Sequence, residues 1–270
     1  MSHAVAAAPV RRRSPGWVPR QHGAWAMILM PFLAGVLRSG GDRIQVLLLA
    51  TCLSGYLAFQ AAGRWATSRW RPRFRAPVLG YGLVAGCLGI ALLLLRPDVW
   101  TWAPIFAACA AVSLLFSWRR RERHLGNDFV TIGAASLLAV LTYQLGYDPG
   151  GTIEVGRRTM WIITAAIGAY LFGTALYVKT IIRERGVRGY VWASVGYHAA
   201  VTAAFAAVVV LRPGPPAGLH HRALLAVTAF FALMTIRAWL LAGRPIRPLY
   251  VGLGEIAASF ALLAIVWLWR

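Results

Sequence analysis

The sequence predicts an all-α integral membrane protein that folds as a bundle of nine transmembrane helices. Hydrophobic residues make up 59% of the 270-residue chain, charged residues only 13%, and the mean hydropathy is +0.62. Soluble domains carry about 25% charged residues. The apolar runs are long and continuous, as in helices that satisfy their own backbone hydrogen bonds in lipid, whereas barrel strands would alternate in polarity.

Nine apolar segments can be read in order, most of them near the roughly 20 residues that cross a hydrocarbon core. They are Gly23–Leu37, Ile44–Ala62, Pro77–Leu95, Val99–Ser117, Asp128–Tyr147, Thr159–Val178, Tyr190–Leu211, Arg222–Ala242 and Leu249–Trp269. The Gly-containing gap 148–158 is expected to be a loop. Residues 1–19 form a polar, flexible cytoplasmic arm, and 20–270 form a single membrane domain without room for a separate soluble domain.

The basic residues mark one side of the predicted bundle. Twenty of the 28 lie in the N-terminal arm or at the gaps after the second, fourth, sixth and eighth segments. By the positive-inside rule, the N-terminus is cytoplasmic, the C-terminus is outside, and the chain spans the cytoplasmic (inner) membrane. The net charge of +20 therefore belongs to loops that meet anionic headgroups. It does not indicate nucleic-acid binding.

The three cysteines indicate packing rather than chemistry. Cys52, Cys87 and Cys109 all lie inside apolar segments, and no two of them have the spacing of metal ligands. Small apolar packing residues are the simpler interpretation. No metal and no other cofactor is expected, because no catalytic or nucleotide-binding motif occurs either.

Polar side chains gather near the predicted cytoplasmic ends of the segments. They are His22, Gln60, Arg64, Asn127, Asp128, Lys179, Arg183, His198, Arg237 and Glu255. Ionisable groups inside a bilayer are costly and indicate function by default. We expect them to line one cytoplasm-facing cavity, with His22, His198 and Glu255 as proton-handling catalytic groups and the other seven as substrate-binding groups.

Simpler structural roles remain open for most of these residues. Asp128 can interact with the positive end of its own helix. Arg64, Arg183 and Arg237 can extend to the headgroups, and His198 can bond within the bundle. Glu255 is harder to dismiss, because a buried carboxylate needs a partner.

The charge balance of the candidate residues indicates the class of ligand. Basic groups equal or outnumber acidic ones, which suits an anionic headgroup or a phosphate. It does not suit a divalent cation, which prefers a cage of oxygen ligands. Lys179 and Arg237 are both possible partners for Glu255.

The opening motif resembles that of the YwiC-like membrane protein family. The motif is Pro19-Arg20-Gln21-His22-Gly23-Ala24-Trp25-Ala26-Met27, running into Pro31-Phe32. Shorter echoes are Asn127-Asp128, Val178-Lys179 with Ile182-Arg183-Glu184, Tyr197-His198 and Gly254-Glu255. The resemblance covers the chain from Pro19 almost to its end.

That family in turn resembles the UbiA prenyltransferases, which implies nine helices and a cytoplasm-facing cavity. UbiA proteins hold magnesium and a diphosphate through Asp-rich motifs after the second and sixth helices. The corresponding stretches here, 59–64 and 177–183, contain no aspartate. Lys179 and Arg183 stand at the spacing of the second motif, so the resemblance implies the fold without the metal cage.

Three classes of function follow from these patterns. The first is a protein that binds an anionic or phosphorylated isoprenoid lipid, with a metal-independent transferase activity as an open question. The second is a small-molecule or proton-coupled transporter in which Glu255 and His198 titrate. The third is a non-catalytic membrane assembly subunit whose protein partner the sequence does not identify.

Overall fold

The structure is a computed structural model that describes residues 17, 24–147, 152–211 and 221–269. The predicted N-terminal arm, apart from Trp17, and the candidate residue His22 lie outside them.

The described part of the chain forms nine α-helices, as predicted, and contains no strand. The α-helices are α1 Ala24–Ser39, α2 Arg43–Thr67, α3 Arg75–Leu95, α4 Ala103–Trp118, α5 Leu125–Gln144, α6 Thr152–Val178, α7 Arg188–Leu211, α8 His221–Leu241 and α9 Pro248–Leu268. The 3-10 turns η1 (Pro72–Phe74) and η2 (Pro97–Trp102) precede α3 and α4, and the π-helical turn η3 (Lys179–Arg183) extends α6.

Eight of the helical segments are long and apolar enough to cross a membrane, and α1 is shorter. The 16 residues of α1 reach only about 24 Å at 1.5 Å per residue. This helix packs against α5, α6 and α9, so protein rather than lipid covers much of it. Ala34 in its centre is completely buried.

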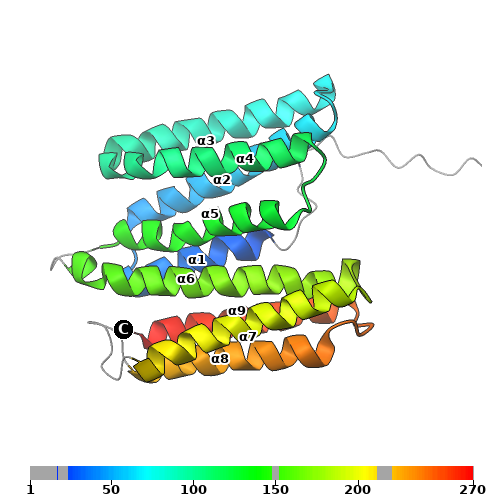
Figure 1. Cartoon of the computed structure of the whole chain (residues 1–270). Helices are drawn as coiled ribbons and strands as arrows, with labels where there is room; N and C mark the ends of the chain where they lie inside the picture. Colours follow the sequence, from blue (N-terminus) through cyan, green and yellow to red (C-terminus); the bar gives the residue numbers. More distant parts are fainter. Residues whose placement is uncertain (1–16, 18–23, 148–151, 212–220, 270) are drawn as a thin grey trace, which may run out of the picture.

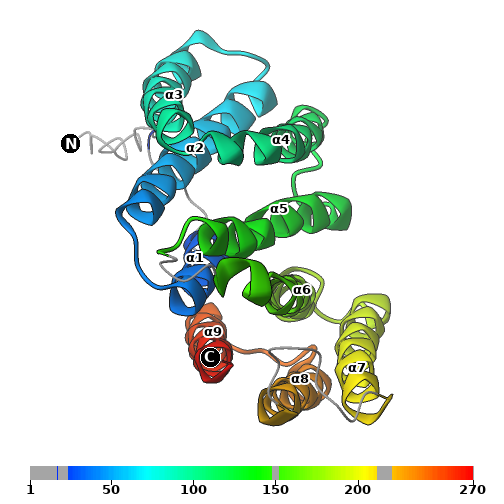
Figure 2. The same cartoon turned by 90° about the vertical axis from the view of Figure 1, so that its left-hand side faces the viewer.

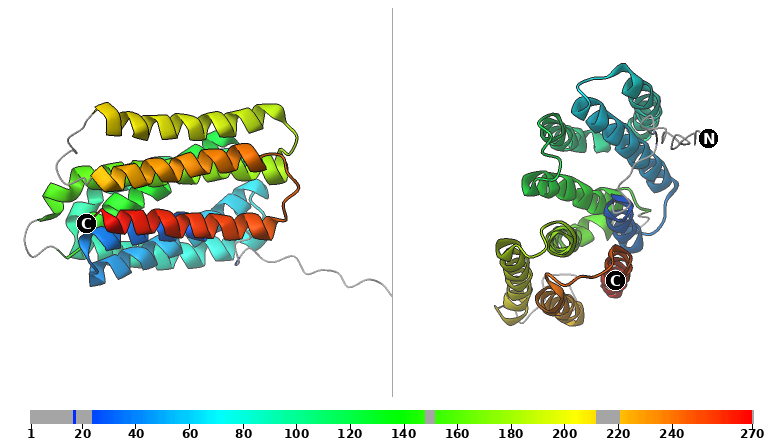
Figure 3. Two further views of the ribbon diagram at one scale, coloured as in Figure 1. Left: turned by 90° about the horizontal axis from the view of Figure 1, so that it is seen from below. Right: turned by 90° about the vertical axis from the view of Figure 1, so that its right-hand side faces the viewer.

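The helices lie side by side and roughly antiparallel to their neighbours in the chain (Figure 1). Seen end-on, α2, α3 and α4 form one end of an elongated array, and α7, α8 and α9 form the other (Figures 2 and 3). Helices α1, α5 and α6 lie between these groups and supply much of the largest apolar core. The middle of the array is therefore filled by helices.

Several helix boundaries differ from the prediction, among them the starts of α5 and α6. Helix α5 starts at Leu125, where the side chain of His124 accepts a bond from the amide of Gly126. Helix α6 starts at Thr152, so 152–158 are helical and the expected loop is wrong over that range. Hydropathy detects only the apolar part of a helix, and the added residues at the start of α6 include Arg157 and Arg158.

A capping box and a buried amide fix the start of α2. The carboxylate of Asp42 accepts a bond from the amide of Ile44, and the side chain of Gln45 accepts one from the amide of Asp42. Gln45 is only 1% exposed, and its Nε2 atom donates to the carbonyl of Thr142 at 2.8 Å. This bond joins α2 to the end of α5.

The basic connections gather at one end of the bundle. The links α2–α3, α4–α5, α6–α7 and α8–α9 all lie at the right-hand end in Figure 1. We refer to this as the basic end. The common location of these four connections agrees with the alternation of basic and less basic gaps in the sequence. Which side of the membrane it faces stays a prediction of the positive-inside rule.

Helices α1 and α5 pack so closely that the contact tolerates no side chain at Gly35. A Cβ atom there would lie 2.6 Å from the carbonyl oxygen of Ala139 and 2.6 Å from Cβ of Thr142. We expect Gly35→Ala to lower the free energy of unfolding by roughly 1–3 kcal/mol through overpacking. Unfolding of the purified protein in mixed micelles would measure this loss.

Gly86→Ala in α3 is the matched control. No atom lies within 4 Å of the Cβ position at Gly86. Alanine is the better helix former by roughly 0.5–1 kcal/mol, so this variant should be unchanged or slightly more stable. Equal effects of the two substitutions would contradict the close α1–α5 contact.

Candidate functional site

A polar cluster joins α6, α8 and α9 around Glu255. Its Oε1 atom lies 2.7 Å from Nη1 of Arg237, while Oε2 accepts from Oγ1 of Thr174 at 2.6 Å and from Oη of Tyr170 at 3.0 Å. The guanidinium carbon of Arg237 lies 4.1 Å from the ring centroid of Tyr177. These five residues are called the Glu255 cluster below.

Helical spacing positions each member of the Glu255 cluster. Tyr170, Thr174 and Tyr177 follow one another at i, i+4 and i+7, so they lie on one face of α6. Arg237 lies about 6 Å inside the end of α8, and Glu255 about 11 Å inside the start of α9. The carboxylate and the guanidinium therefore meet one to two turns inside the basic end.

Arg237 keeps unused hydrogen-bonding capacity in this cluster. Its Nε and Nη2 atoms are buried and have no acceptor among the described residues. Oε1 of Glu255 faces Nη1 without an aligned N–H, so that contact is ionic rather than a hydrogen bond. Each buried donor left unpaired costs about 1–3 kcal/mol. The cluster is thus charge-balanced but incompletely bonded.

His198 on α7 lies close to the same cluster. It is 3% exposed, and its Nδ1 atom lies 2.7 Å from the carbonyl of Ser194 on its own helix. A Cβ atom at Gly173 would lie 2.8 Å from Nε2, so the ring packs directly on α6. The charges of Arg237 and Glu255 both act on the imidazole.

A second ion pair lies at the junction of α5 and α6. Nζ of Lys179 contacts Oδ2 of Asp128 at 2.5 Å and donates to the carbonyl of Arg123 at 2.8 Å. Lys179 opens the π-helical turn, a feature that is frequent at functional sites. Arg237 is therefore the partner of Glu255, and Lys179 pairs with Asp128.

Arg183 closes the same π-helical turn but differs from Lys179 in its surroundings. Its side chain is exposed and makes no ion pair or hydrogen bond within the described residues. The i, i+4 spacing predicts that both cations share one face, yet one is buried and the other exposed. Arg183 is the member of the predicted set that is free to meet a solvent or headgroup anion.

The remaining candidate residues lie apart from the Glu255 cluster. Gln60 and Arg64 are half-buried on α2, which packs mainly on α3 and α4, and both already interact with other groups. Asn127 is buried and connects α4 to α5, because it accepts from Ser113 at 2.6 Å and donates to the carbonyl of Glu122 at 2.7 Å. Its contacts are those of a structural residue.

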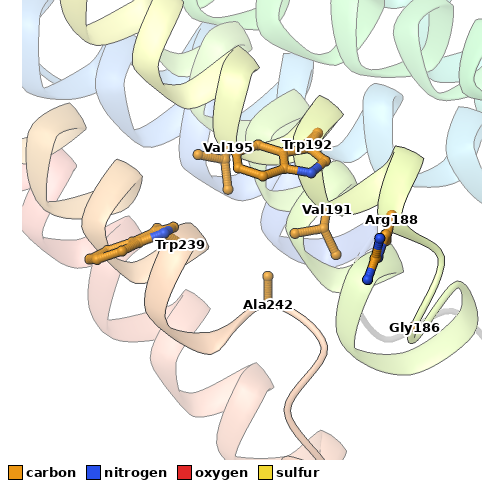
Figure 4. Close-up of a pocket in the computed structure, with 7 residues that line it drawn as sticks. All are labelled: Gly186, Arg188, Val191, Trp192, Val195, Trp239 and Ala242. Atoms are coloured by element: carbon orange, nitrogen blue, oxygen red, sulfur yellow. The ribbon is translucent and has the colours of Figure 1, made fainter.

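Two surface grooves occur elsewhere, and neither is lined by a predicted site residue. One of about 390 Å³ runs between α5, α6 and α7 and is largely apolar. The other, of about 550 Å³, lies between α7 and α8 at the basic end (Figure 4). The single cavity shared by all the candidates stays a prediction. In the described segments, no three His, Cys, Asp or Glu side chains come together as metal ligands.

Sequence reasoning missed the partners that α6 supplies to Glu255. Tyr170 and Thr174 bond directly to the carboxylate, and Oη of Tyr170 also lies 3.2 Å from the hydroxyl of Ser259. The signal was present as a stripe of hydroxyl-bearing residues at i, i+4 and i+7 in an apolar helix. Ser259 likewise follows Glu255 by one turn.

The Arg237–Glu255 pair can be tested with a double-mutant cycle. We expect Arg237→Met or Glu255→Gln alone to cost about 3–5 kcal/mol, because each leaves a buried charge uncompensated. The double variant should lose less than the sum of the two. The measurement is the free energy of unfolding in mixed micelles.

The exposed pair Arg96–Asp98 is the control for this cycle. Its atoms lie 2.9 Å apart, but the side chains are 32% and 41% exposed. Arg96→Met and Asp98→Asn should each cost about 1 kcal/mol or less. Strict additivity in the buried cycle would contradict a direct interaction between Arg237 and Glu255.

Comparison with known proteins supports the family resemblance. The family model described as YwiC-like protein matches residues 18–143. The "Uncharacterized protein YwiC" of Bacillus subtilis (strain 168) is 28% identical over 255 residues, which are 92% of this chain and 96% of that protein. An "Uncharacterized protein" of Haemophilus influenzae is 28% identical over 67% of this chain and 74% of its own length.

No solved structure matches the chain significantly, so the relation to the UbiA prenyltransferases stays a prediction. The matched region contains the opening motif and α1 to α5, and the Bacillus relative extends the similarity across most of the chain. Eight apolar helices of membrane-crossing length accompany it. The chain is therefore a multi-pass membrane protein that is similar to the YwiC-like family over residues 18–143.

Proposed function

We propose that this protein binds an anionic lipid, in the first place a phosphorylated isoprenoid, at the basic end of its bundle and without a metal cage. The observation that carries the proposal is the pair of buried Arg237 donors, Nε and Nη2, that have no acceptor. Phosphate oxygens are strong acceptors for the planar fork of a guanidinium. A bound phosphate would complete the bonding of this side chain.

The charges around the Glu255 cluster favour an anion that arrives in addition to the existing acids. Arg237 is balanced by Glu255, and Lys179 by Asp128. Arg183 has no acidic partner among the described residues, and it is exposed at the end of the π-helical turn that extends α6. A negatively charged headgroup between Arg237 and Arg183 would be attracted by both guanidinium groups, while its hydrocarbon chain stayed in the bilayer.

Proton-handling groups lie beside Arg237. The Glu255 carboxylate is held by Tyr170 and Thr174, and His198 lies within range of its charge. In a metal-independent transfer, these two residues would hold or accept the proton that a reacting group releases. His22, the third candidate for this role, lies outside the described residues.

A thermal-stability titration in detergent tests the binding proposal. The probes are prenyl diphosphates and polyprenyl phosphates, each with magnesium and with a chelator. We expect stabilisation that survives chelation and rises with ligand concentration, reaching about 2.7 kcal/mol at a hundred-fold excess over the dissociation constant. Arg237→Lys should weaken binding about ten-fold or more, because it keeps the charge beside Glu255 but removes the fork.

Arg222→Lys is the matched control for this titration. Arg222 is exposed near the start of the same helix, at the opposite end of the bundle. Its substitution should leave the affinity unchanged. Stabilisation that requires magnesium, or that is equal in wild type and Arg237→Lys, would contradict the proposed site.

A proton-coupled transporter is the second candidate. It is favoured by one observation: a carboxylate and an imidazole lie within apolar helices beside a shared arginine. Such groups mark proton relays in many transporters. In this reading, Glu255 exchanges its ion pair with Arg237 for a proton during the cycle.

Proton flux into liposomes loaded with a pH-sensitive dye tests the transporter candidate. Under an imposed pH gradient, wild-type protein should collapse the gradient faster than empty liposomes, and Glu255→Gln should remove the difference. Asp98→Asn, on an exposed carboxylate, should behave as wild type. Flux that is unaffected by Glu255→Gln would exclude this relay.

A further inference from the structure

A groove between α7 and α8 has the walls and the charge of a phospholipid site. Its volume is about 550 Å³, within the range of about 300–1,000 Å³ that ligand sites occupy. Trp192 and Val195 form one wall, and Trp239 of α8 forms the other (Figure 4). Arg188 lies at the end of the groove beside Gly186.

We propose that this groove binds one anionic phospholipid of the surrounding bilayer, with its phosphate at Arg188 and an acyl chain between Trp192 and Trp239. The proposal goes beyond the function proposed above, because it concerns a different site on the surface of the bundle. Trp239 follows Arg237 by two residues and so projects from a nearly opposite side of α8. Either proposal can therefore fail without the other.

The depth of the two indole rings along their helices matches the interfacial part of a lipid. Trp192 lies about 6 Å inside α7, and Trp239 about 3 Å inside α8, both measured from the basic end. They are 67% and 65% exposed on the protein surface. Tryptophan prefers the headgroup boundary, where an apolar ring and a polar N–H both find partners.

The charge around the groove selects an anionic headgroup. Five exposed arginines lie in and next to the α6–α7 and α8–α9 connections, and they form no ion pair within the described residues. They are Arg183, Arg185, Arg188, Arg244 and Arg247. Glu184 is the one acidic residue of these segments. The groove also ends at the start of α7, where the helix dipole favours an anion.

One part of the groove lining is packed into the protein. Val195 lines the groove and also packs against a cluster that contains Tyr177, Ala238 and Val251. The glycine at the mouth has a φ of +86°, a conformation that admits the sharp turn from η3 into α7. This part of the lining is therefore held by the fold and does not depend on a ligand.

Tryptophan quenching by brominated lipids in proteoliposomes tests this proposal. Brominated phosphatidylglycerol should quench the protein more strongly than brominated phosphatidylcholine at equal mole fraction. The excess should disappear in Trp192→Phe/Trp239→Phe, which identifies the two indoles as its source. Arg188→Gln should lower the preference for phosphatidylglycerol roughly five-fold, the effect of one interfacial cation.

Two variants control for unspecific effects of charge and folding. Arg188→Lys keeps the cation and should retain the preference. Arg222→Gln removes an exposed arginine near the opposite end of α8 and should also retain the preference for phosphatidylglycerol. Equal quenching by the two lipids, or a preference that survives Arg188→Gln, would overturn the proposal. If a second copy of the chain covered the groove, both indoles would be shielded from either lipid, which would overturn it too.

Discussion

The need to neutralise charge inside an apolar bundle organises the half of the molecule around α6. This helix contributes Lys179 to one ion pair, with Asp128 of α5, and the hydroxyls that hold the other, between Arg237 of α8 and Glu255 of α9. A buried charge without a partner would cost several kcal/mol, so the pairs constrain how α5, α8 and α9 are rotated against α6. Helix α7 adds His198 against the same helix.

Close backbone approach plays the corresponding role around α1. Lipid supplies no hydrophobic force between helices, so contacts between small residues and buried hydrogen bonds hold membrane bundles together. Gly35 lets α1 reach α5, and the Gln45 amide bonds to α5 from the start of α2. At the end opposite to the ion pairs, Arg38 donates to the carbonyl of Trp269 at 2.6 Å. The short helix α1 is thus fixed by its neighbours, although it is too short to cross a bilayer without local thinning.

The sequence predicted the helices and their common basic end because hydropathy and arginine distribution are local properties. It could not predict which polar residues meet. Glu255 had two possible partners, and only the rotation of α6, α8 and α9 selects Arg237. Gln60 and Arg64 lie at a similar depth to the other candidates but on a helix that packs elsewhere. The groove between Trp192 and Trp239 depends on the lateral position of two helices, which no spacing rule gives.

The two candidate functions of the Glu255 cluster share one chemical constraint. Arg237 carries a single positive charge, and Glu255 already balances it. A phosphate that bonded to Nε and Nη2 would add negative charge to an interior that stabilises charge poorly. Charge balance would then favour a proton on Glu255, which Tyr170 and Thr174 hold in place in either state. Binding of an anion and uptake of a proton would thus be linked at this cluster, whether the cycle ends in chemistry or in transport.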